Sequence, residues 1–141
     1  MTPESLGAWL LKGNADAADL ASRFAAPRVR NWCVRAGYRA ELMRADQPVV
    51  LWASGSRRRL VYGVWGVGRL AGSAVPGAPG EPWAVPLELT VLDPGDRVPR
   101  ERLRADARLA GAEVLRQPQG ANPSWLTEAE FAALREHLPP A

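Results

Sequence analysis

The sequence predicts an α+β fold with a mostly antiparallel sheet, organised around one hairpin in the middle of the chain. Two apolar runs, at 48–54 and 60–70, are rich in Val, Leu, Trp and Tyr, residues that suit a pleated, half-buried surface. They flank a polar turn at 55–59, whose three consecutive arginines favour an exposed tip. Several glycines interrupt the second run, and glycines inside a strand often mark bulges or bends. We therefore expect a strongly bent hairpin, which is typical of a small barrel.

The residues before this hairpin predict two strands and two helices. A short apolar run at 9–12 predicts the first strand. Apolar residues at helical spacing over 16–24, with acidic residues in the first turn, predict a helix. The alternating stretch 28–35 is expected to be extended, and 38–44 to form a short helix.

The residues after the hairpin predict one more strand and several helical pieces. The segment 73–82 is rich in Pro and Gly and must be a loop. The apolar run 83–92 follows as a strand. Pro99 begins a short helix, since proline is favoured at the first helical positions, and a second short piece is expected at 110–114.

The last helix carries the clearest local signal. Thr127 and Glu130 form a capping box, in which each side chain accepts a hydrogen bond from the other residue's backbone N–H. The helix is predicted over 128–138. Its apolar side is expected to face the core through Phe131, Leu134 and Leu138.

Length and composition indicate a single globular domain. The chain has 141 residues, of which 47% are hydrophobic, and no apolar run approaches the roughly 18 residues that a membrane span needs. Its N-terminus has no basic region before the first short apolar run, so no secretory signal is expected. A single cysteine, Cys33, excludes an internal disulfide and a cysteine-based metal cluster. We expect a cytoplasmic protein without a membrane partner.

The charged residues are unusual in kind. The net charge is +3, and among 18 basic residues only Lys12 is a lysine. A genome rich in G and C would favour arginine codons, in which case the arginines form a solvated surface. Arginine also binds phosphate and stacks on bases better than lysine does, so a nucleic-acid partner stays open.

Most enzyme classes leave no signature in this chain. The one histidine, His137, lies near the end of the last predicted helix, so neither a Ser-His-Asp nor a Cys-His arrangement can be built. No phosphate-binding glycine motif follows a strand and opens a helix. Catalysis would need a carboxylate such as Asp46 or Glu41 in a pocket, and we do not expect an enzyme.

The six tryptophans are the positive signal. Tryptophan serves hydrophobic cores and ligand cages equally well. Four of them lie among apolar neighbours and are predicted to be core residues: Trp9, Trp65, Trp83 and Trp125. Trp52 could face either side of the sheet. Trp32 lies in the basic stretch RVRNWCVR, which favours a groove over a core, the alternative being a lid packed on the sheet.

The order of motifs resembles that of EVE domains. The matching segments run from about residue 8 to 138: WLLKGN, ADL, VRNWCVRAGYRAELM, PVVLWASG, YGVWGVGRL, PWAVPLELTVL, VPRERLRADARLAG and QPQGANPSWLTEAEFAAL. The resemblance implies a PUA-like fold, a mixed pseudo-β-barrel flanked by short helices and related to YTH readers. It further implies a module without catalysis that holds an extruded, modified nucleobase, notably 5-modified cytosine in DNA, in an aromatic-lined pocket.

The resemblance also implies a set of site residues. Trp32 would stack on the base, and Asn14 and Lys12 would contact its edge or a phosphate. The implied base pocket consists of Lys12, Gly13, Asn14, Trp32, Cys33, Val34, Trp52, Ser54, Gln119, Gly120 and Asn122. The implied phosphate contacts are Arg30, Arg35, Arg39 and Arg116. No cofactor or metal is expected.

Two features depart from the family pattern. Gly13 replaces a usual serine or cysteine and removes a side-chain donor, and the loop 72–81 supplies no second cage tryptophan. DNA is favoured over RNA as the partner, a nuclease or restriction partner would fit, and a monomer is expected. The alternatives are a modified-RNA binder and a small-molecule or protein-binding adaptor that uses the same pocket.

Overall fold

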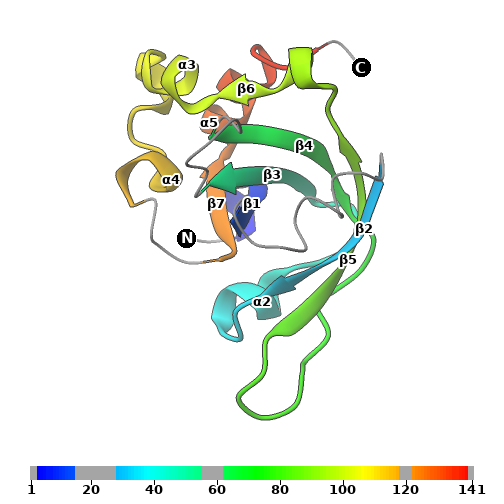
Figure 1. The fold of residues 1–141 in the computed structure, drawn as a ribbon. Coiled ribbons are helices and arrows are strands. Elements are labelled where there is room, and N and C mark those ends of the chain that lie inside the picture. The colour runs from blue at the N-terminus through cyan, green and yellow to red at the C-terminus, as the bar shows by residue number, and fades with distance from the viewer. Residues whose placement is uncertain (1–2, 15–27, 55–61, 118–121, 140–141) are drawn as a thin grey trace.

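The computed structural model describes residues 3–14, 28–54, 62–117 and 122–139 (Figure 1). Within these ranges the first half of the chain contains η1 (Pro3–Ser5), β1 (Leu6–Asn14), β2 (Arg28–Val34), α2 (Tyr38–Leu42), β3 (Pro48–Ser54) and β4 (Gly63–Leu70). The second half contains β5 (Trp83–Val91), η2 (Pro94–Asp96), β6 (Val98–Pro99), α3 (Arg100–Arg104), η3 (Ala107–Leu109), α4 (Glu113–Arg116), β7 (Ser124–Thr127) and α5 (Glu128–Arg135).

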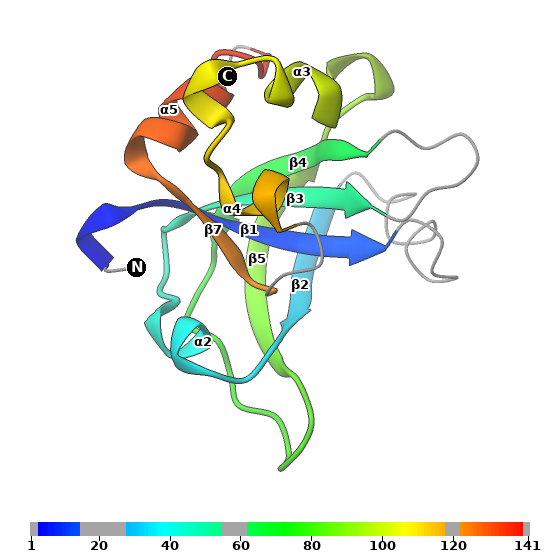
Figure 2. The same ribbon diagram turned by 90° about the vertical axis from the view of Figure 1, so that its left-hand side faces the viewer.

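The strands form one mixed sheet, which confirms the predicted α+β class. Its order is β2-β5-β4-β3-β1-β7, and β6 pairs with β4 outside this path. Only β1 and β3 are parallel among the described strand pairs, so the sheet is mostly antiparallel as predicted. The sheet curls strongly, and it does not close into a barrel (Figures 1 and 2).

The predicted central hairpin is present as the β3–β4 pair. The two strands are antiparallel, and their register shifts between Leu51 and Trp52, where a bulge breaks the ladder. The glycines of β4 mark places where the neighbouring strand comes close. A Cβ on Gly68 would overlap the Glu88 carbonyl of β5. The tip of the hairpin, 55–59, lies outside the described residues.

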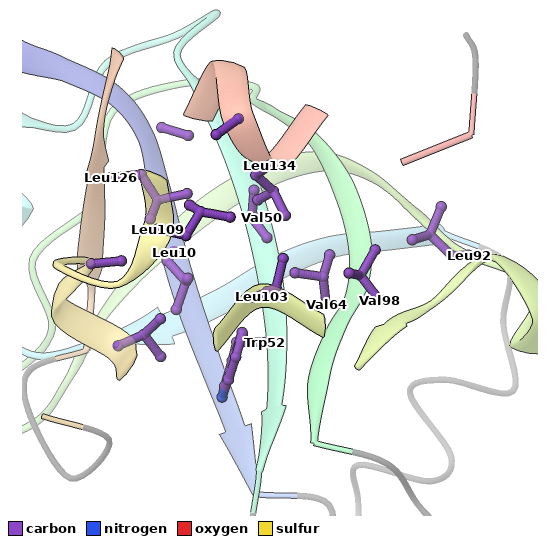
Figure 3. Close-up of a cluster of buried hydrophobic side chains, with 14 residues drawn as sticks. Leu10, Val50, Trp52, Val64, Leu92, Val98, Leu103, Leu109, Leu126 and Leu134 are labelled. Atoms are coloured by element: carbon purple, nitrogen blue, oxygen red, sulfur yellow. The ribbon is translucent and has the colours of Figure 1, made fainter. Parts of the chain in front are cut away.

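Two hydrophobic clusters cover the two faces of the sheet. In β1, Trp9 and Leu11 belong to the first cluster, whereas Ala8 and Leu10 belong to the second, because successive side chains of a strand point to opposite faces. The first cluster lies within the curl and is joined by residues of β2, β5 and α2. The second lies between β1, β3 and β4 on one side and the helices α3, α4 and α5 on the other (Figure 3).

Several local predictions are confirmed. The segments 28–35 and 83–92 form strands, and 38–44 contains a helix. Trp9 and Trp65 are buried, while Trp83 and Trp125 pack partly buried against the first cluster.

The capping box is also confirmed. Thr127 N–H donates to Glu130 Oε1 at 2.9 Å, and Glu130 N–H donates to Thr127 Oγ1 at 3.1 Å. The helix that it begins ends at Arg135, three residues before the predicted end, and Leu138 still packs against the second cluster. None of the helices in the described ranges is long and apolar enough to cross a membrane.

Sequence patterns missed two short strands. Ser124–Thr127 forms β7 beside β1, and Val98–Pro99 forms β6 beside β4. Both are too short to show alternation, so only their partner strands define them. The helix predicted at 16–24 lies outside the described residues.

Candidate functional site

A cleft of about 640 Å³ opens beyond the end of β2, where the curled sheet comes nearest to closing. Three separate parts of the chain form its walls: the end of β2 with the turn before α2, the connection that leads into β5, and the residue that precedes β7 by two positions. The lining residues are Cys33, Val34, Arg35, Ala36, Gly80, Glu81, Pro82 and Asn122. Four of these, Cys33, Val34, Arg35 and Asn122, are among the predicted site residues.

Asn122 holds the walls of this cleft together. Its backbone carbonyl accepts a hydrogen bond from Arg35 N–H at 2.7 Å. Its side-chain Oδ1 accepts from Lys12 N–H at 3.2 Å, and its Nδ2 donates to the Lys12 carbonyl at 3.3 Å. The Asn122 side chain therefore continues the β1–β7 pairing beyond Ser124, in place of a backbone group. Through its backbone carbonyl, Asn122 also links β1 to the turn after β2.

Trp32 lies in the core, so the prediction that it faces a groove is wrong. Only 5% of its surface is exposed, and its ring packs in the first cluster. The indole Nε1–H donates to the Lys12 carbonyl at 3.2 Å. Because side chains alternate along β2, Trp32 and Val34 are buried while Cys33 between them is exposed at the cleft. The three arginines around Trp32 in sequence misled the prediction.

Trp52 is not part of the cleft either. It is 2% exposed and belongs to the second cluster (Figure 3). Trp32 belongs to the first cluster, on the other face of the sheet. Neither tryptophan supplies a stacking surface, and the described residues that line the cleft include no aromatic side chain. The expected aromatic lining is therefore corrected to a polar and aliphatic one.

Arg39 is paired within the protein rather than free for a phosphate. Its Nη1 and Nη2 lie 2.7 and 2.9 Å from the two carboxylate oxygens of Glu113, and Nη1 also donates to the Pro123 carbonyl at 3.1 Å. Ser124 Oγ donates to the same carboxylate at 2.6 Å. The hydrogen bonds from Arg39 hold the pKa of Glu113 at about 2, and Glu113 in turn raises the pKa of Arg39.

Lys12 contacts the cleft wall through its backbone alone. Side chains two positions apart in a strand share a face, so the Lys12 side chain lies on the same face of β1 as Leu10. This face carries Trp52, the partner of Lys12 in the parallel β1–β3 ladder, and lies towards Glu113 and away from Trp32. The ammonium Nζ is shielded from solvent and has no hydrogen-bond partner within the described ranges. Burial lowers the pKa of Lys12, opposed by the charge of Glu113. The Lys12 side chain, predicted to contact a base edge or a phosphate, is not among the residues that line the cleft.

The remaining predicted residues fall into three groups. Gly13 is buried in β1, and Asn14 pairs with Ser54 at the ends of β1 and β3. Gln119 and Gly120 lie outside the described residues. The three other predicted phosphate contacts, Arg30, Arg35 and Arg116, are all exposed. Arg35 lines the cleft, Arg116 lies at the end of α4, and Arg30 borders a different cavity beside Glu88 and Thr90.

Sequence reasoning missed several residues of the site. The loop residues Gly80, Glu81 and Pro82 were recognised as a loop, but nothing local places that loop against β2. Glu113 pairs with an arginine 74 positions away, and Ser124 lies in a strand that has no sequence signature. These contacts exist only once the chain has folded. Within the described ranges, no group of three His, Cys, Asp or Glu side chains could hold a metal ion.

Comparison with known proteins supports the fold. No protein-family model and no curated protein matches the chain. A hypothetical protein from Leishmania major has a TM-score of 0.67 at 16% identity, covering 96% of this chain and 97% of that one. A protein from Pseudomonas putida has a TM-score of 0.66 at 15% identity, covering 92% and 98%. A third, from Rhodopseudomonas palustris, has a TM-score of 0.64 at 17% identity, covering 94% and 92%. At these identities the likeness shows a shared α+β fold.

Proposed function

We propose that this chain is a non-catalytic, EVE-like binding module that holds a modified nucleobase of DNA, 5-substituted cytosine first among them, in the cleft at the end of β2. One observation carries the proposal. Cys33, Val34, Arg35 and Asn122, which the resemblance to EVE domains assigns to the base and its phosphates, line a single cleft although Asn122 is far away in sequence. Its volume of about 640 Å³ is within the usual range of small-molecule sites, roughly 300–1,000 Å³.

The lining residues supply the contacts that a base needs. The Asn122 amide uses one N–H and one oxygen lone pair on the Lys12 backbone, and its second N–H and second lone pair suit a base edge. The backbone of the loop and of the strand end offers further donors and acceptors. Ala36 and Pro82 provide exposed apolar surface, and the exposed Arg35 suits a phosphate. Flipping a base out of a duplex costs a few kcal/mol, which these contacts must offset.

The burial of Trp32 and Trp52 changes the expected basis of selectivity. Without stacking on these rings, a 5-substituent would be sensed by its fit against the apolar wall. One methyl-sized group in such a site contributes roughly 1–3 kcal/mol, or about 10- to 200-fold in affinity. The proposed module is therefore a reader with modest discrimination.

The test is a binding titration with labelled duplexes that differ at one central base. The duplexes carry cytosine, 5-methylcytosine, 5-hydroxymethylcytosine or, at a central adenine, N6-methyladenine. Binding is followed by the anisotropy of the label, since four of the six tryptophans are buried and would respond poorly to quenching. We expect one modified duplex to bind at least several-fold more tightly than its plain counterpart. Equal affinity for all duplexes would refute base reading, and a preference confined to RNA or free nucleosides would favour the alternatives.

Cys33 allows a direct test of where the base binds. It is the only cysteine of the chain and is exposed in the cleft, so N-ethylmaleimide places one bulky group there. We expect alkylation to abolish the preference for the modified duplex. Cys33→Ser protein treated in the same way is the matched control and should keep the preference. Alkylated protein that still selects the modified base would exclude this cleft as the base site.

A further inference from the structure

One side of the molecule carries the helices α2, α3 and α4. Figure 2 faces this side, with α3 above α4 and α2 below, and Figure 1 places the same three helices along one edge. The turn between β2 and α2 lines the cleft, so the cleft lies at the α2 end of this side. We refer to it as the α3–α4 face.

Positive charge is concentrated at the upper end of this face. Residues 97–108 contain five arginines against Glu101 and Asp106, and so carry the same net charge of +3 as the whole chain. Arg102 and Arg104 of α3 are both exposed. Arg116, also exposed, ends α4, and its Nε donates to the Gly111 carbonyl at 2.8 Å, which leaves the outer guanidinium nitrogens available.

The carboxylates close to α3 and α4 are already paired with basic side chains of the protein. Asp106 accepts hydrogen bonds from Arg108 at 2.8 Å and lies 2.9 Å from His137, while Glu113 is paired with Arg39. Glu101 lies 3.7 Å from Arg100. In the part of the chain that the structure describes, no carboxylate forms an ion pair with Arg102, Arg104 or Arg116. Their charges are therefore available to an external anion.

Two further arginines anchor the start of α3. Arg97 lies 4.0 Å from the centre of the Trp65 ring, and its Nε donates to the Leu92 carbonyl at 3.2 Å. Arg100 lies 4.6 Å from the centre of the Tyr62 ring, and its backbone N–H donates to the Tyr62 carbonyl at 2.7 Å. These arginine–aromatic contacts at both ends of the β4–β6 pair position α3 firmly on the sheet.

We propose that Arg102, Arg104, Arg116 and Arg35 form an arginine track along the α3–α4 face, which binds the phosphate backbone of the nucleic acid whose base enters the cleft. The proposal rests on the function inferred above and adds Arg102 and Arg104, which neither the motifs nor the cleft indicated. The track supplies affinity without sequence information, because phosphate contacts position a nucleic acid and base contacts specify it.

The test removes two charges from the track and two from elsewhere. Arg102→Ala/Arg104→Ala is compared with Arg69→Ala/Arg135→Ala, whose exposed arginines lie on β4 and at the end of α5, outside the proposed track. Affinities for a plain and a modified duplex are measured over about 50–200 mM salt. We expect the track variant to lose affinity for both duplexes by the same factor, so that its preference for the modified base is unchanged. The slope of log affinity against log salt concentration should become shallower by about 2, because two phosphate contacts are lost. The control variant should keep the wild-type slope.

The outcomes separate this proposal from the proposed function. The arginine track would be overturned if the track variant kept the wild-type salt dependence, or if the control variant changed by the same amount. A preference for the modified duplex that persists in these variants would leave base reading intact. A flattened slope without any preference in the wild type would support the track and refute base reading. Wild-type protein that binds no duplex even at low salt would overturn both.

Discussion

Trp32 and Cys33 are adjacent residues with opposite surroundings, and this contrast decides what each can do. The indole of Trp32 packs in the first cluster, and its N–H is satisfied by the Lys12 carbonyl. The Cys33 side chain is exposed at the cleft. Because side chains alternate along β2, Trp32 is a structural residue and Cys33 is a candidate ligand contact. The resemblance to EVE domains had placed both in one pocket.

We predict that Trp32→Ala destabilises the protein by about 3–5 kcal/mol, the usual loss for a buried aromatic residue. Trp32→Phe keeps most of the apolar surface and should cost less, mainly through the lost indole hydrogen bond to the Lys12 carbonyl. Urea unfolding measures both. Cys33→Ala is the matched exposed control, expected within about 0.5 kcal/mol of the wild type. A stable Trp32→Ala variant would return Trp32 to the list of ligand contacts.

Glu113 makes the stability depend on pH. Its pKa is lowered from 4.5 to about 2, mainly by the Arg39 hydrogen bonds, so the folded state favours the carboxylate. The resulting stabilisation is fully present above about pH 4.5 and is lost as the pH falls towards 2. Hydrogen bonds from Arg108 also lower the pKa of Asp106, so this residue adds to acid lability in the same direction.

We therefore predict that Glu113→Gln lowers the free energy of unfolding at pH 7 and flattens its decline between pH 4.5 and 2. The variant also removes the anion that opposes the lowering of the Lys12 pKa, which adds to the loss at neutral pH. Unfolding curves over pH for the wild type and the variant measure the difference. Glu88→Gln, at an exposed ion pair, is the control. Parallel curves for the wild type and Glu113→Gln would contradict the assigned role.

Among the elements, β4 shows how sequence and packing combine. Its glycines were predicted to mark bends, and the sheet is indeed strongly curved there (Figure 1). The reason is spatial as well as conformational, because a side chain at Gly68 would collide with the backbone of β5. Curvature of β4 is what brings β5 and β2 around to face the end of β1.

We predict that Gly68→Ala destabilises the protein by about 1–3 kcal/mol, because the Glu88 carbonyl and the Leu89 Cα would have to move. Gly111→Ala is the matched control. Its added Cβ would meet nothing within 4 Å, and it should be neutral or stabilising by up to about 0.5 kcal/mol. Melting temperatures of the two variants provide the comparison. An unchanged Gly68→Ala would mean that β4 and β5 can separate at no cost.

At the scale of the whole molecule, the candidate site exists because the sheet nearly closes. Asn122 and Trp32 both bind the backbone of Lys12, and Asn122 also binds the backbone of Arg35. These contacts join the end of β1 to the end of β2, although β2 is the first strand in the sheet order and β1 lies next to β7, the last strand. The cleft lies beside this junction, and the proposed arginine track would lead to it along the α3–α4 face.

The sequence by itself determined the elements whose signals are local. Apolar runs and alternation predicted the central hairpin, β2 and β5, and the Thr127–Glu130 capping box located the start of α5, because these patterns depend on neighbours a few positions away. The resemblance to EVE domains implied Cys33, Val34, Arg35 and Asn122 as site residues, and the structure brings these four to one cleft. Only the tertiary structure decided which faces they present, that Trp32 and Trp52 are core residues on opposite sides of the sheet, and that Arg39 is neutralised by Glu113. The physical reason is that strand direction, register and long-range ion pairs arise from contacts between distant segments, which leave no periodic trace in the chain.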